Sequence, residues 1–362
     1  MTAYLLLFAF PAWFALVNSR ERGTATSSSR QSWLALKVVF ALAIGLRHEV
    51  GGDWVNYKEN IEYFASLDLL SALTEIRTSD PAFGLLGWLS PGLGDDYFVN
   101  FVCGTLFTVG LISFCRNQSD PWLACTVAVP YLVTVVAMGY TRQGVAIGLS
   151  MLGLVALSRE RLFPFLLWVG VAAAFHKSAV ILIPLAIFSS SQRRWNTILG
   201  VIIVGALAFV LFLQEAVDRL ISGYVSDGME SSGALIRVLM NALPAAMFLL
   251  LRQRFALNSS DRSFWTWMSI GALLFIPVLI FSPSSTAVDR VALYWIPVQI
   301  FVWSRLPQAV STGPRSEGLI RHLIVLFSLM VLLVWLLFAV HSHAWLPYKF
   351  YPWELIKFIF VS

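Results

Sequence analysis

The sequence predicts an all-α protein that crosses a membrane many times. Of its 362 residues, 58% are hydrophobic and only 12% are charged, whereas soluble globular domains carry about 25% charged residues. The apolar residues occur in long blocks separated by short polar segments, which is typical of a polytopic helical membrane protein. We therefore expect one integral membrane domain over residues 1–362.

The apolar blocks predict about twelve transmembrane helices. In order, they cover residues 1–17, 32–46, 97–115, 121–139, 142–158, 162–175, 178–191, 197–213, 234–251, 264–281, 291–304 and 319–340. Residues 54–67 instead have the pattern of an amphipathic helix that lies at the membrane surface. Asp80-Pro81 is typical of the start of another short helix.

The charged residues divide the loops into two sets. One set has fourteen basic and five acidic residues and comprises Arg321 with the loops 18–31, 116–120, 159–161, 192–196, 252–263 and 305–318. Cytoplasmic loops of membrane proteins are enriched in Lys and Arg, so this set is predicted to be cytoplasmic. The opposite side then holds a large extracytoplasmic loop 47–96, a smaller loop 214–233 and the C-terminal segment 341–362.

Arg142 is the only charged residue in the run 121–158. These 38 residues would form a helix about 57 Å long, while the hydrocarbon core is about 30 Å thick. The run must therefore fold back, and Arg142 is expected at the fold, on the extracytoplasmic side. The same reasoning puts His176 and Lys177 at the tip of a hairpin over 162–192, although one tilted helix is the alternative there.

Notable polar residues are thus expected together on one side of the membrane. They are Arg47, His48, Asp53 and Tyr57; Tyr140, Arg142 and Gln143; Phe175, His176, Lys177 and Ser178; and Asp289, Arg290 and Tyr294. Taken singly, each also fits a structural role, such as an arginine that snorkels to the interface. Together they indicate a cavity with an anionic partner, because cations near the membrane core usually face such a cavity.

A diphosphate is the anion that suits several arginines best. The planar guanidinium group binds phosphate oxygens bidentately and keeps its charge. If the diphosphate is a leaving group, the same arginines stabilise the negative charge that grows on it in the transition state. The aromatic residues of the loop 47–96 suit sugar rings, but they also fit an interfacial aromatic belt.

Three motifs follow one another along the chain. They are Arg47, Gly51-Gly52-Asp53 and Tyr57; then Arg142-Gln143; then the run Phe175–Ala179, with the sequence FHKSA. Over about residues 40–300 the chain resembles the EpsG-like family of Wzy-type bacterial polysaccharide (O-antigen or exopolysaccharide) polymerases. Asp80-Pro81 departs from the resemblance, because glutamate is more often expected at that position.

The resemblance implies a glycosyltransferase of the bacterial cytoplasmic (inner) membrane with its active site facing the periplasm or exterior. Such enzymes join repeat units carried on undecaprenyl diphosphate: the growing chain is the donor, and the next lipid-linked unit supplies the acceptor hydroxyl. The implied fold is similar to that of the O-antigen ligases, and the implied chemistry needs neither a metal nor a cofactor. A separate chain-length regulator is a partner that the resemblance implies.

We expect four catalytic residues: His176, Asp53, Arg142 and Arg290. Arg142 and Arg290 would hold the diphosphate, with Arg47 or Lys177 as a further cation. His176 or Asp53 would remove the hydroxyl proton, although His176 could equally donate to a phosphate oxygen. The residues expected to bind substrate are Tyr57, Tyr140, Gln143, Asp289 and Tyr294.

Other functions fit the composition less well. A lipid-linked oligosaccharide transporter would often show internal repeats, and the two halves of the sequence show none. Another lipid-linked glycosyltransferase or ligase would add one unit instead of many. A membrane acyltransferase would take its acyl donor from the cytoplasm, whereas His176 is predicted on the opposite side. No soluble basic segment is present for nucleic acid, and the three cysteines lack CxxC spacing.

Overall fold

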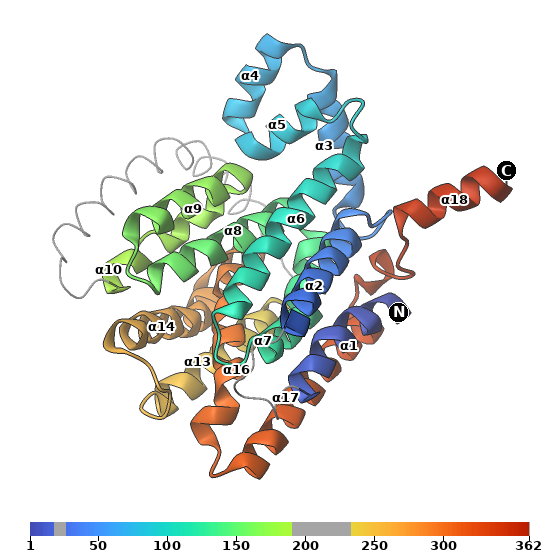
Figure 1. Cartoon of the computed structure of the whole chain (residues 1–362). Coiled ribbons are helices and arrows are strands. Elements are labelled where there is room, and N and C mark those ends of the chain that lie inside the picture. The colour runs from blue at the N-terminus through green and yellow to red at the C-terminus, as the bar shows by residue number, and fades with distance from the viewer. Residues whose placement is uncertain (18–26, 190–232, 362) are drawn as a thin grey trace.

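The structure is a computed structural model that describes residues 1–17, 27–189 and 233–361, and its named secondary-structure elements in these ranges are all helices (Figure 1). The all-α expectation is confirmed for this part of the chain. The predicted helix 197–213 and nearly all of the predicted loop 214–233 lie outside the described residues.

In the first part of the chain, most helices have bounds close to the predicted blocks, but the helix Leu69–Thr78 was not predicted and the predicted helix 178–191 is divided into two short helices. In order they are α1 (Thr2–Val17), α2 (Ser27–Gly45), α3 (Trp54–Ser66), α4 (Leu69–Thr78), α5 (Pro81–Leu89), α6 (Asp95–Arg116), α7 (Pro121–Ala128), the π-helix η2 (Val129–Ala137), α8 (Thr141–Leu157), α9 (Leu162–Phe175), the 3-10 helix η3 (Lys177–Leu182) and α10 (Leu185–Ser189). The amphipathic α3 and the short α5, which begins at Pro81, were both expected from the sequence.

The second part of the chain contains the remaining helices. They are α13 (Ala234–Leu251), α14 (Ser259–Phe281), α15 (Ser285–Ala292), the 3-10 helix η6 (Leu293–Trp295), α16 (Ile296–Val310), α17 (Pro314–Phe338), the 3-10 helix η7 (Ser342–Ala344) and α18 (Tyr351–Val361). Figure 1 shows α3, α4 and α5 together at one end of the molecule and α18 projecting from its side.

Four helices within the described ranges are long and apolar enough to cross a membrane: α6, α13, α14 and α17. Further apolar helices are shorter, at 10–17 residues, and they include α1, α8 and α9. The chain is therefore a membrane protein by its helices, while the count of about twelve spans stays a prediction.

Both expected interruptions of the apolar runs are present. The first run breaks at Tyr140, which is not helical, so that Arg142 lies in the first turn of α8. The second run breaks at His176, whose backbone is extended between α9 and η3. Each break exposes backbone groups that a continuous helix would satisfy internally, and each sets a polar side chain at a helix end.

The described parts of the two sets of loops predicted from charge form two separate groups of contacts, while residues 18–26 and 192–196 of the first set lie outside the described residues. In the first set, Arg321 Nε donates to Asp120 Oδ2 at 2.9 Å, and Arg159 Nη2 donates to Asn117 Oδ1 at 2.7 Å. In the second set, an ion pair joins Arg142 to the loop 47–96. Because α6 and α8 each run from one group to the other, the groups lie at opposite ends of the helices.

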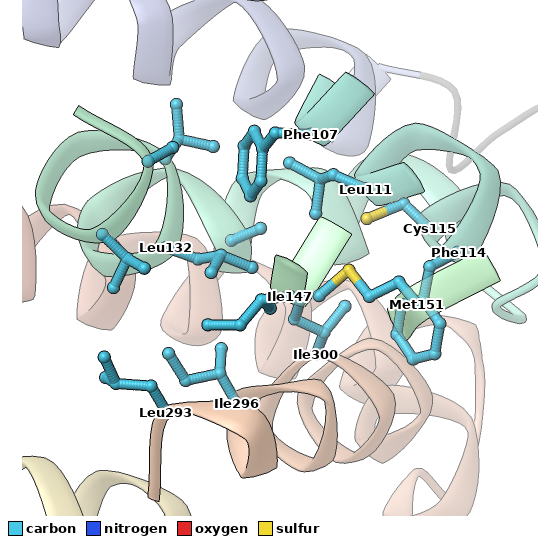
Figure 2. Close-up of a cluster of buried hydrophobic side chains, with 14 of the residues drawn as sticks. Phe107, Leu111, Phe114, Cys115, Leu132, Ile147, Met151, Leu293, Ile296 and Ile300 are labelled. Atoms are coloured by element: carbon cyan, nitrogen blue, oxygen red, sulfur yellow. The ribbon is translucent and has the colours of Figure 1, made fainter. Parts of the chain in front are cut away.

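Four core elements meet through apolar side chains. Figure 2 shows this core, to which α6, η2, α8 and the η6–α16 segment contribute; its labelled residues are Phe107, Leu111, Phe114, Cys115, Leu132, Ile147, Met151, Leu293, Ile296 and Ile300. These ten side chains are buried. Most buried apolar residues of the described chain, from α1 to the C-terminal segment, belong to this same core cluster.

Glycines allow the central helices to approach closely. A Cβ atom added at Gly110 of α6 would lie 1.9 Å from the carbonyl oxygen of Gly148 on α8. In the same way, a Cβ at Gly104 would lie 3.0 Å from the backbone nitrogen of Gly45 on α2. Small residues at such crossings are typical of membrane helix pairs, where close backbone contact gives the van der Waals packing that joins the helices.

The contact between α6 and α8 predicts the effect of a single methyl group. Gly110→Ala should destabilise the protein by about 1–3 kcal/mol, because the backbone of α8 must move to admit the new atom. Gly170→Ala is the matched control, since a Cβ at that helical position meets nothing within 4 Å; it should be neutral or slightly stabilising. Thermal unfolding in detergent measures both, and equal unfolding midpoints for the two variants would contradict the close crossing.

Candidate functional site

The side chains of the candidate site lie at helix ends. Asp53 and Asp80 precede the first turns of α3 and α5, which are positions that favour aspartate. Arg142 lies in the first turn of α8, His176 precedes η3, and Arg290 lies in the last turn of α15. The local sequence therefore fixes where each of these groups leaves its helix.

Arg142 bridges the loop 47–96 and α8. Its Nη1 donates to Asp80 Oδ2 at 2.9 Å. Its Cζ lies 5.4 Å from the ring centroid of Tyr57 and 5.6 Å from that of Phe83, which are cation–π distances. The side chain is 35% exposed, so the guanidinium group is held in place and still reaches solvent.

Arg290 has the same kind of surroundings. Its Nη2 lies 3.7 Å from Asp53 Oδ2, and its Cζ lies 4.0 Å from the ring centroid of Tyr140. The side chain is 33% exposed. The Gln143 side chain donates a short hydrogen bond to the backbone carbonyl of Arg290, which ties the first turn of α8 to the end of α15.

Burial dominates the electrostatics of Asp80. It raises the pKa of the Asp80 carboxyl group, although the nearby charges of Arg142 and Lys177 act in the opposite direction. The backbone of Lys177 also donates a hydrogen bond to this carboxylate. Asp80 therefore connects the first turn of α8 with the break at His176–Lys177 in a poorly hydrated environment.

His176 lies beside both arginines and is tied to a hydroxyl pair. Its Nδ1 is 2.6 Å from Ser178 Oγ, which in turn lies 3.2 Å from the hydroxyl of Tyr294. The residue is partly accessible, yet the packing around its ring, followed by the positive charges of Arg142 and Arg290, lowers the pKa of His176. The imidazole is consequently neutral near pH 7.

A sixth group, Arg237 on α13, was not singled out from the sequence. Its Nε and Nη2 donate to the two carboxylate oxygens of Asp289 at 2.6 and 2.7 Å, a bidentate pair of the strongest kind. Asp289 neighbours Arg290, so this pair supports the end of α15. The signal was available, because Arg237 is the only charged residue in the apolar block 234–251, as Arg142 is in its own block.

The predicted site residues thus fall into two groups. Asp53, Tyr57, Tyr140, Arg142, Gln143, His176, Lys177, Asp289, Arg290 and Tyr294 are linked by the contacts above or by their neighbours in the chain. Arg47 belongs to a different set of contacts. Whether any of them binds substrate stays a prediction.

Arg47 lies in a buried packing contact. It is 1% exposed, and its guanidinium group donates to the carbonyl oxygens of Ile44 and Val50 and to the side chains of Asn100 and Thr141. These bonds join the end of α2 to α6 and to the first residue of α8, which precedes Arg142. This geometry fits a positioning role, and the predicted contact of Arg47 with a diphosphate stays untested.

The C-terminal segment 344–351 closes the same region. Trp345 Nε1 donates to the carbonyl oxygen of Thr134 at 2.7 Å, and a Cβ added at Gly139 would lie 2.4 Å from the Trp345 ring. The Gly51 backbone nitrogen donates to the carbonyl of Ala344 at 2.9 Å. The indole therefore packs on the backbone just before Tyr140.

The described residues contain no group of three or more His, Cys, Asp or Glu side chains that could hold a metal ion.

Comparison with known protein families decides the identity of the chain. The family model described as the EpsG family matches residues 32–350. The chain belongs to the EpsG family. The match spans every residue of the site described above. The comparisons with curated proteins and with solved structures found no match.

Membership of the EpsG family indicates a membrane protein of exopolysaccharide biosynthesis that is related to glycan polymerases. The resemblance seen in the sequence is thereby confirmed at the level of the family. In this EpsG-family chain, the cluster around Arg142, His176 and Arg290 combines two partly exposed cations with a neutral imidazole. Such a set can hold an anion and accept a proton beside it.

The buried position of Arg47 predicts that its removal lowers the stability of the fold, whatever its effect on substrate binding. Arg47→Ala should lower the free energy of unfolding on the order of 3 kcal/mol, because it leaves buried oxygens of several segments without their donor. Arg142→Ala is the matched control and should cost less, since its side chain is 35% exposed. Thermal unfolding followed by tryptophan fluorescence compares them. A stable but inactive Arg47→Ala variant would contradict this prediction and would support a role of Arg47 in substrate binding.

Proposed function

We propose that this EpsG-family protein transfers a growing glycan from undecaprenyl diphosphate to a hydroxyl group of the next lipid-linked repeat unit. The observation that carries the proposal is the pair of partly exposed guanidinium groups, Arg142 and Arg290, whose charges both act on His176. A diphosphate needs several fixed positive charges at one place, and arginine supplies them in the geometry of phosphate oxygens.

The surroundings of the two arginines favour anion binding. The rings of Tyr57 and Tyr140 contact the two guanidinium groups. The stacking of Arg290 on Tyr140 leaves the edge donors of the guanidinium group available, while Arg142 also shares a side-chain hydrogen bond with Tyr57. The Arg290–Asp53 contact is long, at 3.7 Å. An incoming diphosphate would therefore find donors that are already oriented, which lowers the entropy lost on binding.

In the proposed reaction, the oxygen of the acceptor hydroxyl attacks the anomeric carbon of the donor sugar. The bond between that carbon and the diphosphate oxygen breaks, and its electron pair leaves on the diphosphate. Arg142 and Arg290 would stabilise this growing charge. These two guanidinium groups provide positive charge that a metal ion supplies in other diphosphate sites, which supports metal-independent chemistry.

His176 is the proposed general base that receives the hydroxyl proton. If Ser178 Oγ donates to the Tyr294 hydroxyl, it accepts from His176 Nδ1–H, and Nε2 is then free to accept a proton. Bound diphosphate would offset the two positive charges that lower the pKa of His176, so the imidazole would become a stronger base when substrate is present. Asp53, with a carboxylate 32% exposed, is the alternative base.

The proposal puts the reaction on the outer face of the bacterial cytoplasmic membrane. Its support is the charge bias of the loops and the grouping of the Arg142 side chain with the loop 47–96. The lipid-linked oligosaccharide is the proposed substrate, a chain-length regulator is a proposed partner, and no role for nucleic acid is proposed.

The arginine pair predicts a loss of polymer without a loss of protein. Arg142→Ala and Arg290→Ala should each reduce the rate of glycan extension by about 10²–10³, the usual effect of removing one donor to a developing oxyanion. Arg254→Ala is the control, because Arg254 is an exposed arginine in the loop 252–263, in the opposite set of loops. Gel analysis of the glycan ladder and an immunoblot of membranes measure activity and protein level. A full ladder from both variants would refute the proposal, and one added unit in place of a ladder would indicate a single-step transferase.

The lowered pKa of His176 predicts an unusual pH profile. An ordinary histidine gains a proton as the pH falls through about 6.5, and a general base would then be lost. His176 should instead stay neutral in the free enzyme, so kcat/KM should be flat between about pH 7.5 and about pH 5.5. Rates of glycan extension across this range test the expectation, with His176→Gln and Asp53→Asn compared at one pH. A fall with an apparent pKa near 6.5, or an active His176→Gln variant, would contradict the role of His176.

A further inference from the structure

An apolar groove runs through the second half of the helical bundle. It has a volume of about 520 Å³ and is lined by α7, η2, α13, α14, α16 and α17. Sites for drug-sized ligands occupy about 300–1,000 Å³, so this groove is large enough to hold a ligand. Its position does not coincide with the arginine site described above.

The groove is lined mainly by apolar side chains, and two of its polar side chains already donate hydrogen bonds within the protein. Four lining residues carry polar side-chain groups: Tyr131, Gln299, Trp303 and Ser328. Gln299 Nε2 already donates to Asn241 Oδ1 at 2.7 Å, and Ser328 Oγ donates to the carbonyl oxygen of Ile324 at 2.8 Å. A hydrocarbon could therefore enter without leaving these two donors unpaired.

One face of α13 forms the long wall of the groove. Ile236, Leu239, Met240, Leu243 and Ala246 line it, at the spacing of a single helix face. From Ile236 to Ala246 this wall extends about 15 Å along the helix axis. Ile236, Leu239 and Leu243 are 66, 45 and 54% exposed, so the groove opens on the outer surface of the bundle, where a membrane protein meets lipid.

One end of the groove reaches the charged site. Ile236 lies next to Arg237, which holds Asp289 beside Arg290. Tyr131, another lining residue, lies within electrostatic reach of Arg237, Asp289 and Arg290. On α17 the lining residues Phe327 and Val331 lie near the middle of the helix. The groove therefore leads from the arginines into the depth that the hydrocarbon core would occupy.

We infer that this groove binds the polyprenyl tail of the lipid-linked substrate while the diphosphate of the same molecule lies at Arg142 and Arg290. The inference rests on the proposed function and specifies its substrate further. A charged head and an apolar tail must be bound at adjacent places. The lining residue Ile236 next to Arg237, and the lining residue Tyr131 within electrostatic reach of Arg237 and Arg290, provide that continuity. Tail binding removes apolar surface from lipid and from any water in the groove, and close packing of the branched chain gives selectivity.

Photolabelling of the full-length protein tests the inference directly. The probe is a farnesyl diphosphate analogue with a diazirine on its terminal isoprene unit, and the protein is held in nanodiscs of phosphatidylethanolamine and phosphatidylglycerol. We expect peptide mapping to find the label on the groove faces of α13 and α17, and unlabelled undecaprenyl diphosphate to remove it. Label spread evenly over exposed helix surfaces would overturn the inference.

Tryptophan substitutions that fill the groove, compared with one outside it, test the same inference. Ala246→Trp should reduce labelling about tenfold or more, because the indole takes the place of buried tail carbons. Ala35→Trp is the control, since Ala35 is an exposed residue of α2 that does not line the groove; its labelling should equal that of the unchanged protein. Val331→Trp fills the groove from α17 and repeats the test if Ala246→Trp does not fold. Undiminished labelling in a folded, groove-filled variant would overturn the inference.

Two further measurements distinguish other occupants. Equal labelling of the groove by a diazirine-bearing phosphatidylglycerol would show an ordinary lipid site and would overturn the inference. A dimer of the unchanged protein that Ala246→Trp converts to a monomer, by light scattering, would show that a second copy fills the groove and would also overturn it.

The outcomes separate this inference from the proposed reaction. Groove labelling in a protein that forms no glycan would keep the tail site and refute the polymerase. A glycan ladder made without groove labelling, and made equally well by Ala246→Trp, would refute the tail site alone.

Discussion

The buried guanidinium group of Arg47 is the contact on which the rest of the site depends. It connects the carbonyl group of Ile44 in the last turn of α2, that of Val50 in the segment after α2, an amide on α6 and a hydroxyl at the start of α8. The turn after α2 leads to Asp53, α6 lies behind that turn, and α8 carries Arg142. A charge buried at 1% exposure is tolerated only when its donors are satisfied, so this network allows little variation in the placement of the segments.

The exposed arginines are held differently, and the difference suits their proposed role. Arg142 and Arg290 each contact one carboxylate and at least one aromatic ring, and about a third of each side chain stays accessible. Carboxylates keep the cations in place before substrate arrives. The Tyr140 ring stacks on the Arg290 guanidinium group and leaves its edge donors available to a phosphate, whereas Arg142 also shares a side-chain hydrogen bond with Tyr57. Around them, helix ends supply the geometry: α3, α5, α8, η3 and α15 all begin or end at the site.

The sequence allowed much of this arrangement to be predicted. Apolar blocks gave the helices, and the length of the run 121–158 required a break near Arg142, which the structure has at Tyr140. The pairing of Arg142 with Arg290 around His176 followed from their predicted common side. The buried role of Arg47 could not be predicted, because an arginine at the end of an apolar block has the same pattern whether its partners are ligands or carbonyl groups. The Arg237–Asp289 pair required knowledge of which helices are neighbours.

The docking of Trp345 has a consequence for biosynthesis. Its indole fills the space left by Gly139 and donates to the carbonyl of Thr134, yet it follows Thr134 in the chain by 211 residues. During translation, the segment around Tyr140 and Arg142 is therefore inserted into the membrane long before its packing partner is made. The site can therefore acquire its final shape only after Trp345 has been synthesised and packed against this region.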